Sequence, residues 1–288
     1  MDLSETRDLL WLAAILYGLA VISGFASTYF TKENFYKKCT LSAIVIGFIF
    51  QTRGLYLRGL EIRGCPLGNE LERIQFIAWS LILTFLILRL LWKLNLLGSF
   101  CSCMAAGLGA VSLSSKEWDQ TYWLNPDYER LFADPWIELH ASIAIFSYGI
   151  FALLSIVSAM YLIQRKSLLA RKVGFSGSFL PPIHDLEQAA HKLLLIGTLF
   201  LTLSIIVGGM HWSRNPEFVT TSKLFITLVV WLGYGVLLIL RNKNILFGSK
   251  FAKVSIALFA AAIISLGFVN SKKENLTKES RTQTVFHL

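Results

Sequence analysis

The chain has 288 residues, of which 55% are hydrophobic and only 16% are charged. Soluble domains carry about 25% charged residues, so this composition excludes an ordinary soluble protein and predicts a protein that lies in membrane lipid. The formal net charge of +9 does not indicate nucleic-acid binding, because most basic residues fall in short loops between apolar segments, where membrane topology already explains them.

Eight apolar segments follow one another along the chain. Each has close to the ~20 residues that a helix needs to cross the hydrocarbon layer. They are residues 9–30, 39–57, 75–92, 94–112, 139–163, 193–212, 224–240 and 252–269. Gly, Ser and Cys dilute the hydrophobicity of the fourth segment. The pattern predicts an all-α fold, a polytopic membrane helix bundle with about eight transmembrane helices.

The first apolar segment is expected to remain in the protein as a helix. A secretory signal peptide begins with a basic region. Here the leading residues include Asp2, Glu5 and Asp8 against the single base Arg7. This charge pattern argues against cleavage of the segment as a signal peptide.

Lysine and arginine concentrate in the loops after the first, third, fifth and seventh segments. Cytoplasmic loops of membrane proteins are enriched in these residues, so we assign these loops to the cytoplasm and expect both termini to face outward. The basic residues are Lys32, Lys37, Lys38, Arg89, Lys93, Arg165, Lys166, Arg171, Lys172, Lys192, Arg241, Lys243, Lys250 and Lys253. The outward loop between the second and third segments breaks the pattern, with arginines in or beside it: Arg53, Arg58, Arg63 and Arg73.

We expect one transmembrane domain over residues 1–270, followed by a polar, disordered tail over residues 271–288. The outward loop 114–138 is acidic and aromatic, which is typical of a short helix that lies on the membrane or folds over a pocket. No internal repeat is evident, so an inverted-repeat transporter gains no support.

The four cysteines do not predict a covalent haem site. The chain has no Cys-x-x-Cys-His sequence, so it carries no c-type haem attachment signature of its own. Cys101 and Cys103 lie two apart on a predicted helix and point to different sides, so we do not expect a bond between them.

Two histidines stand at the ends of apolar segments. His140 opens the fifth segment and His211 closes the sixth, so the predicted topology places both at the outer face. Neutral imidazole is an axial ligand of haem iron, and ionisable residues within membrane segments are often functional. We therefore predict that His140 and His211 hold a haem iron between them. The alternative is an interfacial histidine that bonds water or a backbone carbonyl.

Small residues at helical spacing accompany both histidines. The fifth segment carries His140, Ala144, Ser147, Phe151, Ser155 and Ser158 in this register, and the sixth carries Gly197, Ser204, Gly208 and His211. Small residues at such positions allow two helices to approach closely in lipid. The seams predict close contact between the two helices, either for packing alone or to form a site.

The outward arginines could bind the propionates of a haem. Arg53, Arg58 and Arg63 are the arginines concerned, and the guanidinium group binds carboxylates through two parallel hydrogen bonds. The alternatives are snorkelling to lipid headgroups and pairing with the nearby acids Glu61, Glu70 and Glu72.

Tryptophans near the predicted outer face could cover a porphyrin ring. We expect this role for Trp118, Trp123 and Trp212, with Trp136 also near this face. The alternative is the ordinary belt of aromatic residues at the membrane interface.

Several stretches carry the motifs of one known family. Residues 63–72, RGCPLGNELE, run on to Trp79 and resemble a "G-R-x-P-L-x-N-x-x-E … W" motif. Residues 139–142 with Ser147 and Tyr148 look like an "L-H-x-S … Y" helix. Residues 185–203 are similar to an "L-E-x-L … L-L-x-x-G-F-x-L-L-T" helix. A "K-E-x-W-x-x-x-T-W-x-x-Y" run is echoed by Lys223, Thr227, Trp231 and Tyr234. These motifs, in this order, resemble the cytochrome c assembly proteins of the CcsA/HemX-like family.

The resemblance implies a membrane protein that handles haem in c-type cytochrome biogenesis. It would carry or present haem b at the outer face of a bacterial inner membrane, together with assembly partner proteins and apocytochrome c. His140 corresponds to an outward axial ligand in this family. The implied role is that of a carrier or chaperone subunit rather than a stand-alone enzyme.

The chain departs from the family pattern in three places. The tryptophan-rich "W-x-W-D-P-K-E" core is reduced to residues 211–218, HWSRNPEF. A histidine expected at the end of the next helix is replaced by the Leu-rich residues 237–241, and the outward histidine near the last helix is missing. These losses resemble the shorter HemX-like branch. They also favour an alternative, a structural or regulatory subunit that binds no haem.

Overall fold

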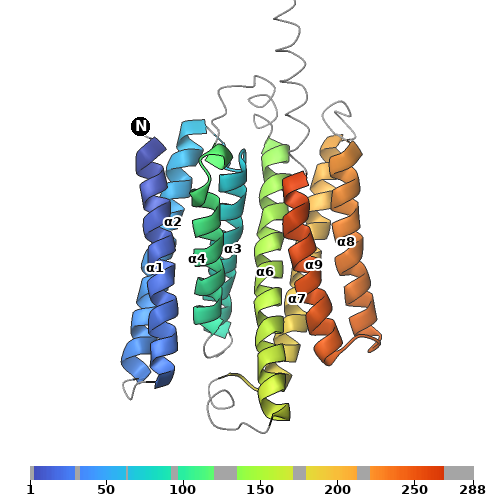
Figure 1. Ribbon diagram of the computed structural model, residues 1–288. Coiled ribbons are helices and arrows are strands. Elements are labelled where there is room, and N and C mark those ends of the chain that lie inside the picture. Colours follow the sequence, from blue (N-terminus) through green and yellow to red (C-terminus); the bar gives the residue numbers. More distant parts are fainter. Residues whose placement is uncertain are drawn as a thin grey trace, which may run out of the picture.

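The computed structural model describes residues 3–29, 33–62, 64–91, 97–119, 135–170, 180–212 and 221–268. Within these ranges it contains only helices, which confirms the all-α prediction (Figure 1). They are α1 (Leu3–Tyr29), α2 (Glu33–Ile62), α3 (Glu70–Leu91), α4 (Leu97–Ser114), the 3-10 helix η1 (Glu117–Asp119), α6 (Pro135–Leu169), α7 (Ile183–Trp212), α8 (Thr221–Asn242) and α9 (Gly248–Phe268). The eight α-helices are all long and apolar enough to cross a membrane.

Several helices extend beyond the apolar segments that predicted them. The largest difference at one end is in α7, which begins at Ile183 rather than at residue 193, and α6 spans Pro135–Leu169 rather than residues 139–163. With its 35 residues, α6 is about 50 Å long, well beyond the ~30 Å of the hydrocarbon layer. Hydropathy marks only the part of a helix that lies in hydrocarbon, so it underestimates the length of helices that continue into the membrane interface.

The small residues of α4 lie where this helix packs against its neighbours. A methyl group added at Gly98 would lie 3.0 Å from the Phe85 ring, and one at Gly109 would lie 3.3 Å from Ala14. The glycines therefore let α4 approach α3 and α1 closely, which explains the diluted hydrophobicity of this segment. Cys101 is buried and Cys103 is exposed, so their side chains point to different sides of α4, as predicted.

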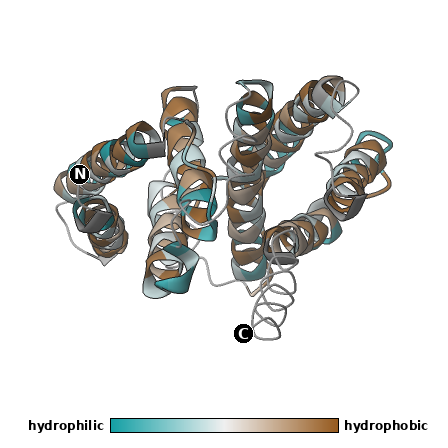
Figure 2. Cartoon of the chain, turned by 90° about the horizontal axis from the view of Figure 1, so that it is seen from above, coloured by the Kyte–Doolittle hydropathy of each residue, from teal (hydrophilic) through white to brown (hydrophobic). Residues whose placement is uncertain are grey.

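The helices form two groups that lie side by side, α1–α4 and α6–α9 (Figures 1 and 2). Contact between α3 and α6 joins the groups, and α6 also packs along α7 and α9. Gly149 of α6 faces Ser80 of α3, where an added methyl group would overlap the Ser80 hydroxyl. The core at this junction includes Leu81, Phe151 and Leu154, none of which is exposed by more than 1%. Thus α6 is the central helix of the bundle.

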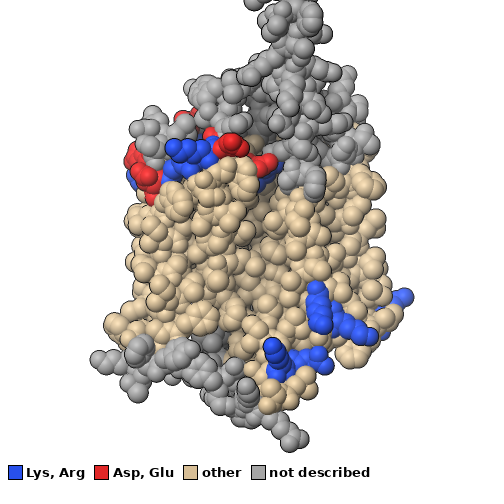
Figure 3. All heavy atoms as spheres, in the orientation of Figure 1, with Lys and Arg blue, Asp and Glu red and all other residues tan. Residues whose placement is uncertain are grey.

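Charged residues separate between the two ends of the bundle (Figure 3). The end where α1 begins and η1 lies shows Asp and Glu side chains beside Lys and Arg, and we call it the acidic end. The opposite end shows Lys and Arg on the face in view, and we call it the basic end. Helices α1, α6 and α8 begin at the acidic end, and α7 and α9 end there (Figure 1). His140 and the end of α7 therefore lie at the same end of the molecule.

Candidate functional site

His140 lies near the start of α6 and faces α7. Its Nδ1 atom lies 2.7 Å from the backbone carbonyl oxygen of Ser204 and 3.0 Å from the Ser204 hydroxyl oxygen. The Ser204 hydroxyl donates in turn to the His140 backbone carbonyl, at 2.9 Å. A carbonyl oxygen can only accept, so Nδ1 carries the proton in this arrangement and Nε2 of the neutral ring keeps its lone pair.

Gly208 makes the approach of this imidazole to α7 possible. A methyl group at Gly208 would lie 2.6 Å from His140 Nδ1 and 2.8 Å from Cε1. About three helical turns earlier in α7, a methyl group added at Gly197 would lie 2.5 Å from the Phe151 ring. The two seams predicted from the sequence therefore do pack against each other, and the histidine is part of that contact.

Two tryptophans stand one helical turn beyond this contact, at the end of the seam. Trp136 precedes His140 by four residues and Trp212 follows Gly208 by four, so each shares a helix face with the residue it flanks. The two side chains are 45% and 44% exposed. Trp212 was among the predicted site residues, whereas Trp136 was not assigned to the site. The four-residue spacing from His140 was the signal that could have found it.

Three predicted site residues cannot be compared with the position of His140. Arg63 and Trp123 lie outside the described residues. The backbone of His211 belongs to the last turn of α7, but its side chain is also outside the described part of the chain. A second axial ligand therefore stays a prediction.

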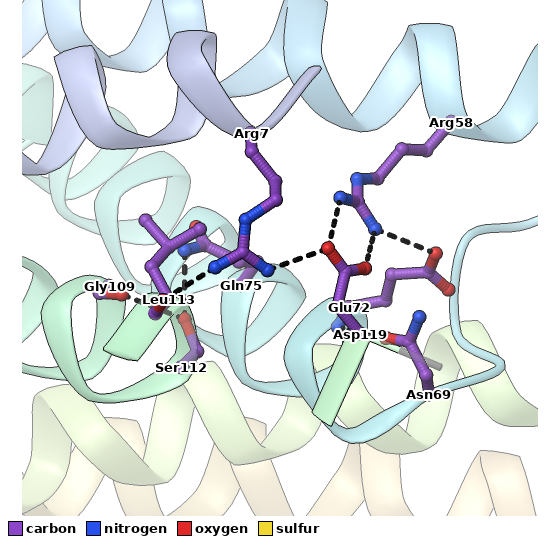
Figure 4. A network of polar contacts seen from close by, with 9 residues as sticks. All are labelled: Arg7, Arg58, Asn69, Glu72, Gln75, Gly109, Ser112, Leu113 and Asp119. Atoms are coloured by element: carbon purple, nitrogen blue, oxygen red, sulfur yellow. Dashed lines mark hydrogen bonds and ion pairs between the residues drawn. The ribbon is translucent and has the colours of Figure 1, made fainter. Parts of the chain in front are cut away.

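Arg58 lies in a buried cluster of ion pairs at the acidic end (Figure 4). Its two terminal nitrogens donate to the Asp119 carboxylate at 2.7 and 3.1 Å, and one also reaches Glu72 at 3.4 Å. Arg7 donates to the same Asp119 carboxylate at 2.7 Å. The Arg58 side chain is only 2% exposed, so a propionate would have to displace these carboxylates to bind it.

Asp119 is the residue at which this cluster joins η1 to α1 and α2. Burial would raise the pKa of its carboxyl group, but the hydrogen bonds and positive charges of Arg58 and Arg7 outweigh burial, and the pKa is lowered from its ordinary value of 3.8. Arg7 also donates to the Leu113 carbonyl at 2.7 Å, at the end of α4. The cluster thus ties the start of the α4–α6 connection to the first helix group.

A chain of buried polar side chains runs below the ion pairs. Tyr17 donates to Gln51 at 2.8 Å, Gln51 donates to Gln75 at 2.9 Å, and Gln75 donates to Ser112 at 2.9 Å. These residues come from α1, α2, α3 and α4 in turn. Each polar group finds a partner inside the bundle, so the chain fixes the mutual position of the four helices.

The other predicted residues of this region lie on the first helix group. Trp118 packs against the cluster of Leu10, Leu55, Leu71 and Leu113, and Arg53 is exposed on α2. The structure therefore does not bring Trp118, Arg53 or Arg58 to the α6–α7 seam.

The connection between α2 and α3 contacts the start of α6. The backbone N–H of Cys65 donates to the Glu138 carboxylate at 2.9 Å, and its thiol lies 3.3 Å from the Ser142 hydroxyl. Burial raises the pKa of the Cys65 thiol, the hydrogen bond with Ser142 partly opposes this rise, and the charges of Glu138 and Glu72 add smaller upward contributions. This contact places the connection that carries Arg63 close to the helix of His140.

A family model described as "Cytochrome C assembly protein" matches residues 67–277. The chain belongs to this family. The resemblance drawn from the sequence motifs is thereby confirmed, and the matched range contains the whole α6–α7 seam.

Relatives in this family match most of the chain. It is 23% identical to the protein HemX of Brevibacillus brevis over 93% of this chain and 98% of that protein. It is 26% identical to HemX of Bacillus subtilis over 89% of this chain and 92% of that protein. A cytochrome c biogenesis protein CcsA, from Cyanidium caldarium, is 24% identical over 87% of this chain and 92% of that protein.

The described donor groups at the seam suit a haem better than a metal ion held only by protein. Among the described residues, no three of the types His, Cys, Asp and Glu come together as ligands. A haem iron takes its equatorial ligands from the porphyrin and needs only axial ligands from the protein. The unprotonated Nε2 of His140 is chemically suited to that position.

Proposed function

We propose that this protein takes part in c-type cytochrome biogenesis and holds haem b beside the α6–α7 seam, with His140 as an axial ligand. Membership of the cytochrome c assembly family supports the role in biogenesis. The observation that carries the haem proposal is the commitment of His140 Nδ1 to Ser204, since this leaves Nε2 as the electron-pair donor.

Different residues around the seam would contact different parts of the haem. Trp212, with Trp136 beside it, would contact the porphyrin face, and His211 would be the second axial ligand. Trp118 and Trp123 remain in the proposed cover over the ring, although Trp118 would have to leave its packing in the first helix group. Such aromatic contacts add apolar burial and specific geometry.

Arginines would bind the propionates. In this proposal Arg53 and Arg63 are partners of the propionates. Arg53 is exposed on α2 and would have to approach the seam from the first helix group, and Arg63 lies outside the described residues. Arg58 would join them only by exchanging its present carboxylate partners. Arginine suits this task because its planar group matches a carboxylate.

We further propose that the acidic end faces outward from a bacterial inner membrane, with both termini on that side. The concentration of Lys and Arg at the basic end supports this orientation. The protein, one transmembrane domain over residues 1–270 with a tail over residues 271–288, would act with assembly partners that hold the reduced thiols of apocytochrome c.

An absorption spectrum of the protein purified in mild detergent tests the haem proposal. We expect a Soret band in the wild type that weakens or shifts in His140→Ala. The control is His184→Ala, since His184 is exposed on α7 at the basic end. A colourless preparation from haem-replete cells that does not change on adding haem would contradict the proposal.

A second candidate function is a structural or regulatory subunit of a cytochrome assembly complex that binds no haem. The observation that favours it is the replacement of an expected histidine by residues of α8, where Leu237 is buried among apolar neighbours. In that case the His140–Ser204 contact would only join α6 to α7, and the purified wild-type protein would show no Soret band.

A further inference from the structure

We infer that Ser204 is a positioning residue, which fixes the His140 imidazole as the Nδ1–H tautomer and thereby selects a ligand with an electron-accepting centre. The inference about the ring stands on geometry alone. The inference that the ligand is a metal-centred planar cofactor rests on the proposed function.

Ser204 and His140 make three polar contacts with each other. The imidazole N–H is shared between the carbonyl oxygen of Ser204, at 2.7 Å, and its hydroxyl oxygen, at 3.0 Å. The hydroxyl proton goes the other way, to the backbone carbonyl of His140 at 2.9 Å. Since the hydroxyl proton is used there, the hydroxyl oxygen can only accept from Nδ1. Every bond in this set therefore requires the proton on Nδ1.

The position of Gly208 explains how a helix carbonyl can take a second donor. In an α-helix the carbonyl of residue 204 already accepts from the N–H of residue 208. A carbonyl oxygen has two lone pairs, but the side chain of residue 208 would normally cover the second. With only hydrogen at this position, the imidazole reaches the carbonyl, whereas a methyl group would lie 2.6 Å from Nδ1.

The consequence is a ring with one committed and one open nitrogen. Among the described residues, His140 Nε2 has no hydrogen-bond partner, and the hydrogen bonds of the ring are all with Ser204. A neutral ring in this tautomer offers a lone pair and attracts a metal centre, not an anion. Hydrogen bonding at Nδ1 also orients the lone pair, as ligating histidines in metal sites usually require.

Nitrogen-15 NMR of the histidine-labelled protein in lipid nanodiscs, prepared without haem, tests the inference. His140→Gln assigns the His140 signals. We expect a proton on Nδ1 and none on Nε2 in the wild type. Ser204→Ala keeps the carbonyl acceptor but removes the hydroxyl acceptor and the return bond to α6. We therefore expect a measurable share of the Nε2–H tautomer beside the Nδ1–H form, and Ser204→Thr should restore the wild-type state.

The matched control is Ser155→Ala, because the Ser155 hydroxyl donates only within α6, to Ala152 at 2.8 Å. It should leave the His140 signals unchanged. A wild-type ring with its proton on Nε2, or a Ser204→Ala spectrum identical to that of the wild type, would overturn the inference.

Haem titration of the same proteins separates this inference from the proposed function. Loss of a residue that orients a metal ligand typically weakens binding by 10–100-fold, so we expect about tenfold weaker haem binding in Ser204→Ala and recovery in Ser204→Thr. A wild type that shows the expected tautomer but binds no haem supports the role of Ser204 and contradicts the proposed function. Equal haem affinity in the wild type and Ser204→Ala would overturn the positioning role.

Discussion

At the scale of single residues, a missing methyl group decides how close His140 comes to α7. Gly208 and Gly209 are neighbours in the same helix, yet only Gly208 faces the imidazole. An added methyl group at Gly209 would have nothing within 4 Å. Alanine substitutions at these two glycines therefore separate the effect of a clash in the α6–α7 contact from the general effect of alanine on a helix.

We expect Gly208→Ala to push the imidazole away from Ser204 and to lower the free energy of unfolding by about 1–3 kcal/mol, the usual cost of overpacking. Gly209→Ala should be neutral or stabilising by up to about 1 kcal/mol, because alanine favours the helix. Unfolding of both variants in detergent, with haem content measured alongside, tests this. Equal behaviour of the two variants would contradict the seam geometry.

Asp119 is the second residue on which local structure depends. It holds two guanidinium groups, and Arg58 is 2% exposed. Removing one partner of a buried ion pair costs about 3–5 kcal/mol, so Asp119→Asn should destabilise the protein by an amount of this order. Glu117→Gln is the control, since Glu117 is exposed in the same short helix. Similar melting temperatures for the two variants would argue against the importance of the cluster.

The lowered pKa of Asp119 predicts how its contribution depends on pH. A carboxyl group with a depressed pKa in the folded state stabilises the protein above its unfolded pKa, and the contribution is lost as pH falls through the folded value. The stability difference between wild type and Asp119→Asn should therefore be constant above about pH 5. It should shrink below the ordinary Asp value of 3.8. A difference that already disappears between pH 7 and pH 5 would contradict this assignment.

At the scale of helices, hydropathy alone predicted the number of membrane segments. It failed at the helix ends, because α6 and α7 continue past the hydrocarbon layer, where polar residues are tolerated. It also could not explain the Gly, Ser and Cys content of α4, since their role depends on which helices lie beside it. Spacing within one helix was enough to predict the seams of α6 and α7.

Partners far apart in the chain were not predictable in the same way. The nearby glutamates were predicted as alternative partners of Arg58, and Glu72 does pair with it. Its closer partner, Asp119, lies 61 positions away, and nothing in the local pattern indicates that η1 folds onto α1 and α2. Only tertiary structure shows that Arg58 is engaged.

The buried polar chain yields a test at the level of helix packing. Gln75→Leu keeps roughly the size of the side chain but removes one of the two acceptors of the Gln51 amide and the donor to the Ser112 hydroxyl oxygen. Gln51 keeps the backbone carbonyl of residue 75 and Ser112 keeps its bond to Gly109, and each buried polar group left unsatisfied costs about 1–3 kcal/mol. Thr84→Val is the control, because the Thr84 hydroxyl bonds only within α3, to Ser80. We expect a much lower unfolding temperature for Gln75→Leu than for Thr84→Val. Comparable temperatures would mean that the chain does not stabilise the first helix group.

At the scale of the whole molecule, the two ends of the bundle differ in charge. The acidic end carries the start of α6, which includes His140, and the end of α7, so the proposed orientation places the candidate site outside the cytoplasm. This proposal can be tested without any assay of function.

In a variant without the four natural cysteines, we expect Lys116→Cys to react with a membrane-impermeant maleimide in intact cells, because this exposed residue lies at the acidic end. Lys250→Cys, exposed at the basic end, should react only after the membrane is permeabilised. The reverse pattern would place His140 on the cytoplasmic side and contradict the proposed orientation.

The most direct test of the account is chemical rescue of His140. His140→Gly should lose the Soret shift that haem binding gives in the purified wild type, and added imidazole should restore it by occupying the vacated ligand position. Imidazole should have no such effect on the wild type. If His140→Gly binds haem with wild-type spectrum and affinity before imidazole is added, His140 is not the ligand.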